Sequence, residues 1–103
     1  MLSLRIAASI LGICAAVALA SGPALAAGDA KAGRQKALQC QTCHGLDGQA
    51  KLPDAPNLAG QTAIYLAKAL KDYRGGARRN DMMSVIAHAL SDQDIDNLAA
   101  YYA

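Results

Sequence analysis

Two cysteines and a histidine lie within five residues of one another in the segment ALQCQTCHG, from Ala37 to Gly45. Three kinds of chemistry use such a cluster: a redox-active dithiol, a zinc site, and the covalent attachment of haem. Each of these needs a different setting, so the rest of the sequence can distinguish among them.

A thioredoxin-type dithiol lies at the start of a helix in a βαβ unit, where the helix N-terminus lowers the thiol pKa. In this sequence the cysteine pair follows a predicted helix, and no strand is predicted nearby. A zinc site needs a fourth ligand besides Cys40, Cys43 and His44, and the other histidine is His88. Because His44 directly follows Cys43, these two side chains are also poorly placed to share one tetrahedral ion.

C-x-x-C-H is the signature of covalent haem attachment. Two thiols on one helical turn can each add to a vinyl group at the edge of the macrocycle, and His44 then lies beneath it to bind the iron. The sequence therefore predicts one haem c, attached through Cys40 and Cys43, with His44 as one axial ligand of the iron.

A second axial ligand is expected from a methionine pair. Sulfur ligation raises the reduction potential, and with both axial positions filled no site is left for substrate or O₂. Met82 and Met83 are adjacent, so helix periodicity does not choose between them, and His88 is a further candidate that a surface position explains better. These ligands predict an electron carrier and not an enzyme. A haem enzyme or gas sensor with an open sixth position is the alternative.

The first 26 residues have the pattern of a cleaved export signal. Arg5 precedes an apolar run from Ile6 to Ala20, and Ala24-Leu25-Ala26 has the small-x-small form of a signal-peptidase site. The run is shorter than the roughly 20 residues of a membrane-spanning helix, which disfavours an uncleaved anchor. We expect cleavage after Ala26, a periplasmic protein comprising residues 27–103, and no membrane span in the mature form.

The composition of the mature part favours a cofactor at its centre. Alanine dominates the apolar residues, and the chain contains no Phe and no Trp. A small domain with such short side chains buries little apolar area and usually needs a metal, disulfides or a cofactor for stability. The charge is nearly balanced, at +2 for the whole chain. This balance, without interleaved aromatic and basic residues, argues against a nucleic-acid partner.

The elements that must position the cluster are predicted to be helical throughout. Asp29 can cap a first helix running to about Gln39, with Ala30, Gly33, Ala37 and Leu38 along one face. Loop residues fill 45–60, and a helix over 62–73 has Ala63, Leu66, Ala67, Leu70 and Tyr73 on its buried face. Gly75 and Gly76 end it. After a short apolar piece over 82–90, Ser91 and Asp94 resemble a capping box for a last helix to Tyr102.

The mature chain resembles class I c-type cytochromes, especially the small single-haem bacterial cytochromes of the c553 type and one half of cytochrome c4. The matching segments are GDAKAGRQKALQCQTCHGLDG, PNLAGQTAIYLAKALKDYRGGARRN and LSDQDIDNLAAYYA. The resemblance implies an all-α fold wrapped around the haem, with the first and last helices crossing at Gly33. It also implies that the Pro56 carbonyl binds the His44 ring, and it selects Met83 over Met82 as the sixth ligand.

The expected function is periplasmic electron transfer between redox partner proteins, such as a flavoprotein or a terminal oxidase. The alternative within the same family is a cytochrome subunit of a redox enzyme, for example a sulfide-oxidising flavocytochrome. Basic residues between Lys68 and Arg79 are either a solvated face or a docking surface for an acidic partner. If they dock, charge reversal at Lys71 and Arg74 is expected to slow association.

Overall fold

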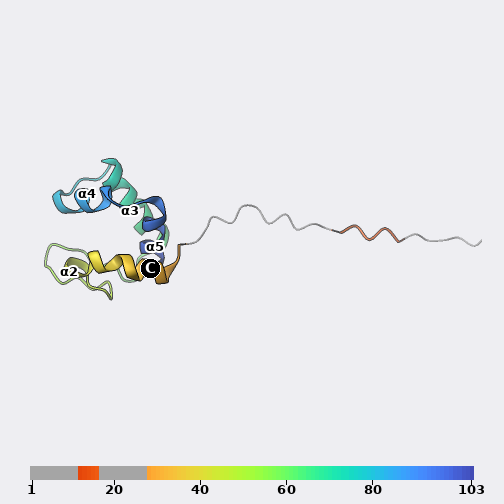
Figure 1. The fold of residues 1–103 in the computed structure, drawn as a ribbon, viewed down its shortest axis with the longest axis horizontal. Helices are drawn as coiled ribbons and strands as arrows, with labels where there is room; N and C mark the ends of the chain where they lie inside the picture. Colours follow the sequence, from red (N-terminus) through yellow and green to blue (C-terminus); the bar gives the residue numbers. More distant parts are fainter. Residues whose placement is uncertain (1–11, 17–27) are drawn as a thin grey trace, which may run out of the picture.

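The computed structural model describes residues 12–16 and 28–103, and the second of these ranges forms one helical domain (Figure 1). Most of the predicted signal segment, and its predicted cleavage point after Ala26, lie outside the described residues. Residues 12–16 are irregular, and Cys14 is exposed. Among the described helices, none combines the length and the apolar character needed to cross a membrane.

The described residues contain helices and loops and no strand, which confirms the all-α prediction. In chain order the elements are α1 (Ala30–Lys36), the 3₁₀-helix η1 (Ala37–Gln39), α2 (Gln41–His44), α3 (Ala63–Gly75), α4 (Asp81–His88) and α5 (Asp92–Tyr102). The predicted first helix is therefore continuous up to Gln39, but its last turn tightens. The apolar piece after residue 81 is a helix.

The helix ends follow from local side-chain chemistry. Asp29 accepts hydrogen bonds from the N–H groups of Lys31 and Ala32 at the start of α1, at 2.9 and 3.2 Å. Ser91 and Asp94 form the predicted capping box of α5, with both hydrogen bonds at 3.0 Å. Gly76 ends α3 in the left-handed conformation, with φ 85°.

The closely packed helix pairs are α1 with α5, α3 with α5, and α3 with α4. Gly33 lies at the α1–α5 crossing, where a Cβ atom would come within 1.9 Å of the Asn97 carbonyl oxygen and 2.9 Å of the Tyr101 Cβ. Only a residue without a side chain permits this approach. The crossing that the family resemblance implied is therefore confirmed.

The core is small and centred on α5. Ile95 is its largest fully buried side chain. The apolar residues that are buried are Ala37, Leu66, Ala87, Leu90, Ile95, Leu98, Ala99 and Tyr102. Three positions predicted to lie on the apolar faces of the first two helices are instead exposed, namely Ala30, Leu38 and Ala63. Leu38 turns outward because the tight 3₁₀ turn interrupts the α-helical periodicity on which the prediction was based.

Replacing Gly33 with alanine is expected to lower the free energy of unfolding of the haem-containing protein by about 1–3 kcal/mol, because the new methyl group forces α1 away from Asn97. Denaturant unfolding of the intact protein measures this. Gly75→Ala is the matched control: an added Cβ at Gly75 meets nothing within 4 Å. Equal stability of the Gly33→Ala variant and the wild type would contradict the close crossing.

Candidate functional site

Cys40, Cys43 and His44 lie on one short helical turn. Cys40 is the N-cap of α2, and its carbonyl accepts the His44 N–H at 2.9 Å. Both thiols are half-buried and form no disulfide. The structure thus brings the three predicted residues together, at the end of the domain where α2 and α4 lie (Figure 1).

The environment of Cys40 is unlike that of a reactive dithiol. Burial raises the pKa of the Cys40 thiol, the neighbouring Cys43 acts in the same direction, and Lys36 opposes them more weakly. Catalytic dithiols instead need a lowered pKa to supply a thiolate. For zinc, no group of three or more His, Cys, Asp or Glu side chains is suitably gathered within residues 12–16 and 28–103. Both alternatives to haem therefore lack structural support.

His44 is buried and its ring is held in one orientation. The Nδ1 atom lies 2.9 Å from the Pro56 carbonyl oxygen, as the resemblance implied. A carbonyl can only accept, so Nδ1 carries the proton and Nε2 keeps its lone pair for a metal. This is the usual arrangement of a metal-ligating histidine, in which an outer hydrogen bond fixes the tautomer and the ring.

Hydrogen bonds connect the loop that contains Pro56 to the cysteine segment and stabilise its path. The Lys51 N–H donates to the Cys43 carbonyl at 2.8 Å, and the Ala50 N–H donates to the Asn57 side-chain oxygen at 2.7 Å. From the sequence, residue 57 was predicted only to lie in the loop over 45–60. The position of Asn57 directly after Pro56 was the sequence signal for this contact, because a side-chain amide there can bind the backbone of the same loop.

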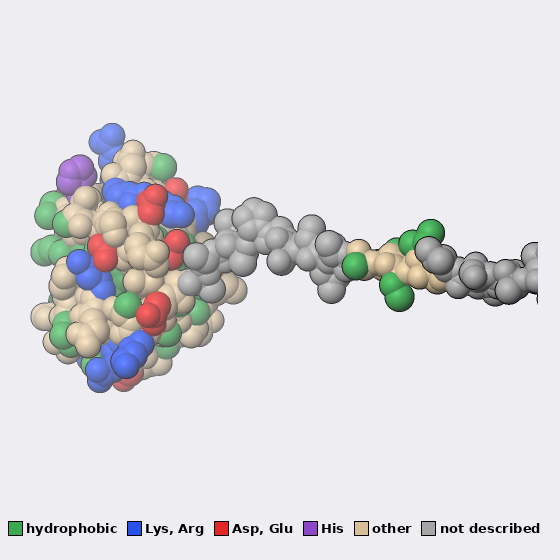
Figure 2. Space-filling view, turned by 45° about the vertical axis from the view of Figure 1, so that its right-hand side comes forward, with side chains coloured by type: hydrophobic (Ala, Val, Ile, Leu, Met, Phe, Trp, Pro, Cys, Tyr) green, Lys and Arg blue, Asp and Glu red, His purple; other side chains and the backbone are tan. Residues whose placement is uncertain are grey.

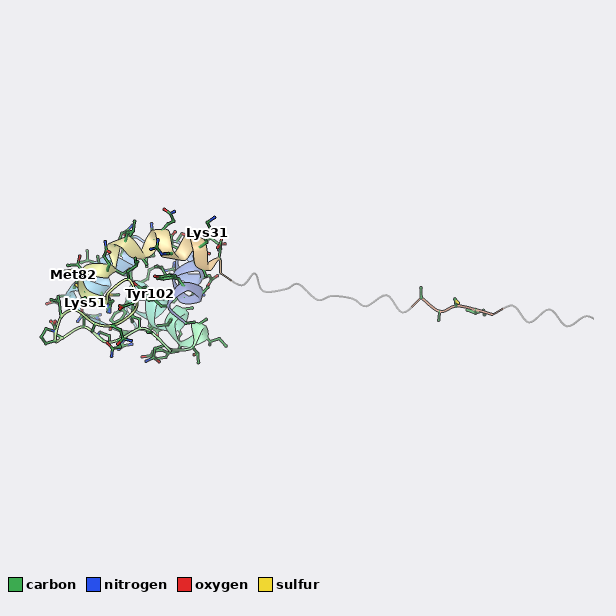
Figure 3. The ribbon with its side chains drawn as sticks, turned by 90° about the horizontal axis from the view of Figure 1, so that it is seen from below. Lys31, Lys51, Met82 and Tyr102 are labelled. Carbon is green, nitrogen blue, oxygen red and sulfur yellow. The ribbon has the colours of Figure 1, made fainter. Side chains whose placement is uncertain are left out.

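Two tyrosines at the end of α5 also contact this segment. The Tyr102 hydroxyl donates to the Gly45 carbonyl at 2.9 Å, and the Tyr101 hydroxyl donates to the Leu46 carbonyl. Tyr102 lies in the interior of the domain, whereas Lys31, Lys51 and Met82 lie at its periphery (Figure 3). Burial raises the pKa of Tyr102, and Cys40 adds a smaller contribution, so its hydroxyl remains a donor. The last helix was predicted to end at Tyr102, but no local pattern indicated these contacts.

The methionines lie in the first turn of α4, and both N–H groups donate to the Asn80 side-chain oxygen, at 3.1 and 2.9 Å. Met82 is 62% exposed, whereas Met83 is half-buried. His88 is exposed and lines a separate polar pocket together with Arg79 and Ser84. Of the three candidate ligands, Met83 is therefore the one turned toward the interior.

A family model described as Cytochrome c matches residues 30–102. The chain belongs to the cytochrome c family. Cytochrome c-554(548) of Halomonas halodenitrificans is 49% identical over 80 residues, which are 75% of this chain and 96% of that protein. A crystal structure of reduced cytochrome c4 from Pseudomonas stutzeri superimposes with a TM-score of 0.69 and 41% identity, covering 74% of this chain and 45% of that one.

A third relative of this cytochrome is named a thiosulfate dehydrogenase electron acceptor, from Stutzerimonas stutzeri strain A1501. It is 48% identical over 65 residues, which are 62% of this chain and 30% of that protein. The chain thus spans nearly all of cytochrome c-554(548) but less than half of the cytochrome c4 and of this acceptor.

The comparisons confirm the class I c-type cytochrome fold and its cofactor, a covalently bound haem c. The residues of this segment fit that group: two thiols at C-x-x-C spacing, followed by an imidazole whose Nε2 is available. The cytochrome is an electron-transfer protein that exchanges electrons with redox partners.

Proposed function

We propose that Cys40 and Cys43 attach the haem through thioether bonds, and that His44 and Met83 are the axial ligands of its iron. The observation that carries this proposal is the 2.9 Å contact between His44 Nδ1 and the Pro56 carbonyl oxygen, because it leaves Nε2 as the metal-binding atom. The half-buried position of Met83 in α4 supports it as the second ligand over the exposed Met82.

Each residue then has a defined task. The thiols of Cys40 and Cys43 would tether the macrocycle, while the Pro56 carbonyl accepts a hydrogen bond from the Nδ1–H group of His44, which holds the ring and strengthens the donor character of Nε2. Met83 supplies a thioether sulfur, which favours the reduced state. The bound haem supplies reversible exchange of one electron.

With both axial positions filled by side chains, the protein is a carrier and not an enzyme. A haem enzyme or gas sensor with an open sixth position is the competing function. Visible spectra of the purified protein in both oxidation states separate the two. The carrier is expected to give a low-spin spectrum with a sulfur-to-iron charge-transfer band near the red end, whereas a high-spin ferric spectrum, or rapid CO binding without ligand displacement, would contradict the proposal.

We infer that residues 1–26 are a signal peptide and that the carrier comprises residues 27–103 in the periplasm. The Ala24-Leu25-Ala26 site and the need of c-type haem attachment for an exported chain support this inference. The intact mass of the haem protein isolated from a periplasmic fraction is expected to correspond to cleavage after Ala26. Retention of the first 26 residues in membranes would contradict it.

The partners are proposed to be a dehydrogenase that supplies electrons and an acceptor such as a terminal oxidase. The relative named a thiosulfate dehydrogenase electron acceptor favours a sulfur-compound dehydrogenase as donor. A flavoprotein of the sulfide-oxidising flavocytochrome type is the other candidate. Copurification with such an enzyme in a fixed ratio would indicate a permanent subunit, whereas isolation of the cytochrome alone would indicate a free carrier.

Some of the basic side chains between Lys68 and Arg79 already bind groups of the same domain. Arg74 pairs with Asp92 at 2.6 Å and donates to the Leu90 carbonyl at 3.2 Å, and Lys68 pairs with Asp72. Reversal of Arg74 would therefore disturb the packing of α3 against α5 as well as any docking. Positive and negative side chains are interspersed on the face shown in Figure 2, so no large surface of one sign is seen there.

Lys71 is the better residue for a test of docking, because it is exposed and belongs to none of the ion pairs among the described residues. If this face meets an acidic partner, Lys71→Glu is expected to slow association several-fold at low salt, with little effect at high salt. Stopped-flow electron transfer measures the rates, and Lys31→Glu on α1 is the control. Equal rates for the Lys71→Glu variant and the wild type would mean that Lys71 is only solvated.

A further inference from the structure

The turn that follows His44 is held from the last turn of α5 by two tyrosine hydroxyls. Gly45 ends α2 with φ 73°, and here the backbone leaves the helix. The Gly45 carbonyl accepts the Tyr102 hydroxyl at 2.9 Å, and the next carbonyl, that of Leu46, accepts the Tyr101 hydroxyl. These contacts join residues that are 57 and 55 positions apart in sequence.

The local hydrogen bond to the Gly45 carbonyl is longer than the one from Tyr102. This carbonyl also accepts the Gly48 N–H, but at 3.3 Å, which is longer than an ordinary backbone hydrogen bond. A Cβ atom at Gly45 would lie 2.4 Å from the Gln49 carbonyl oxygen, so the turn is tightly enclosed. The Tyr102 hydroxyl is therefore the shorter of the two contacts that hold this carbonyl.

The tyrosine rings are themselves fixed. They meet edge to face, with centroids 4.9 Å apart and an interplanar angle of 62°. Tyr102 is 6% exposed and packs in the core with Ala37, Ile95 and Leu98. Rings held in this way present their hydroxyls at defined positions, so α5 acts as a rigid support for the turn.

His44 is consequently restrained on both sides along the backbone. The carbonyl of the preceding residue, Cys43, accepts the Lys51 N–H at 2.8 Å, and the carbonyl of the following residue, Gly45, accepts the Tyr102 hydroxyl. We propose that Tyr101 and Tyr102 are positioning residues for His44: by fixing the Gly45 and Leu46 carbonyls, they set the direction in which the imidazole projects toward the haem iron. This inference rests on the proposed role of His44 as the axial ligand.

The test uses Tyr102→Phe, Tyr101→Phe and the double variant in the haem-containing protein. Each change removes one oxygen atom and keeps the ring. In the ferric form, the hyperfine-shifted proton resonances of the His44 ring are expected to move in Tyr102→Phe and to move further in the double variant, with a parallel change in reduction potential. Tyr73→Phe is the matched control, because the Tyr73 hydroxyl makes no side-chain hydrogen bond within the described residues.

Unchanged His44 resonances and potential, together with a lower thermal unfolding midpoint, would show that the hydroxyls only stabilise the fold and would overturn the inference. If the double variant does not fold, the Tyr102→Phe single variant decides the question on the same two readouts. A wild-type spectrum without histidine-ligated haem c would overturn the proposed function together with this inference. That result is recognised before any variant is compared.

Discussion

Replacing Cys40 and Cys43 together with alanine is expected to abolish covalently bound haem completely. Both thiols lie on the turn that presents His44, and no other cysteine is present in residues 27–103. Haem staining of a denaturing gel measures the loss. Cys14→Ala is the control, and it is expected to retain full staining because Cys14 lies within the proposed signal peptide.

The same double variant is expected to be largely unfolded. Among the described residues, the core contains three alanines in eight buried apolar residues and has Ile95 as its largest fully buried side chain, so little apolar area stabilises the domain by itself. A group that binds only the folded state adds its binding free energy to the stability. Circular dichroism of the variant measures the remaining helix. Retained staining would refute the attachment sites, and a folded apoprotein would refute the role of haem in the core.

Met83→Ala is expected to remove the sulfur-to-iron charge-transfer band and to lower the reduction potential, because the thioether ligand is lost. Met82→Ala is the matched control and is expected to keep the band, since Met82 is adjacent in sequence but 62% exposed. The visible spectrum and a redox titration measure both effects.

The opposite pattern, with the band lost only in Met82→Ala, would move the ligand by one residue. Absence of the band from the wild-type protein would contradict a methionine ligand from α4. His88→Ala then tests the remaining candidate, although His88 is exposed and faces the polar pocket near Arg79.

The features predicted correctly from the sequence depend on short-range chemistry. The Asp29 cap, the Ser91–Asp94 capping box and the glycine end of α3 are each encoded within four residues. The turn that joins Cys40 to His44 is equally local. The Gly33 crossing and the Pro56 contact are long-range, and they were predicted only because the chain resembles a known family.

The features that were missed or wrong depend on contacts between distant residues. Leu38 was placed inward because an α-helical period was assumed through a turn that is 3₁₀. Arg74 was grouped with the basic residues of a solvated or docking face, whereas its guanidinium binds Asp92 and the Leu90 carbonyl across the α3–α5 packing. The hydroxyl contacts of Tyr101 and Tyr102 need the path of a loop 55 to 57 residues earlier, which no local pattern specifies.

The hydrogen bonds between the end of α5 and the turn at Gly45 imply an order of steps in the folding of the protein. During synthesis, the turn after the C-x-x-C-H segment emerges 55 to 57 residues before the tyrosines that contact it, so it cannot be closed against them at that stage. If Cys40 and Cys43 carry the haem as proposed, we expect attachment to take place before α5 closes against this turn. Docking of α5 then holds the turn, and we expect the protein to resist proteolysis only once its final helix is in place.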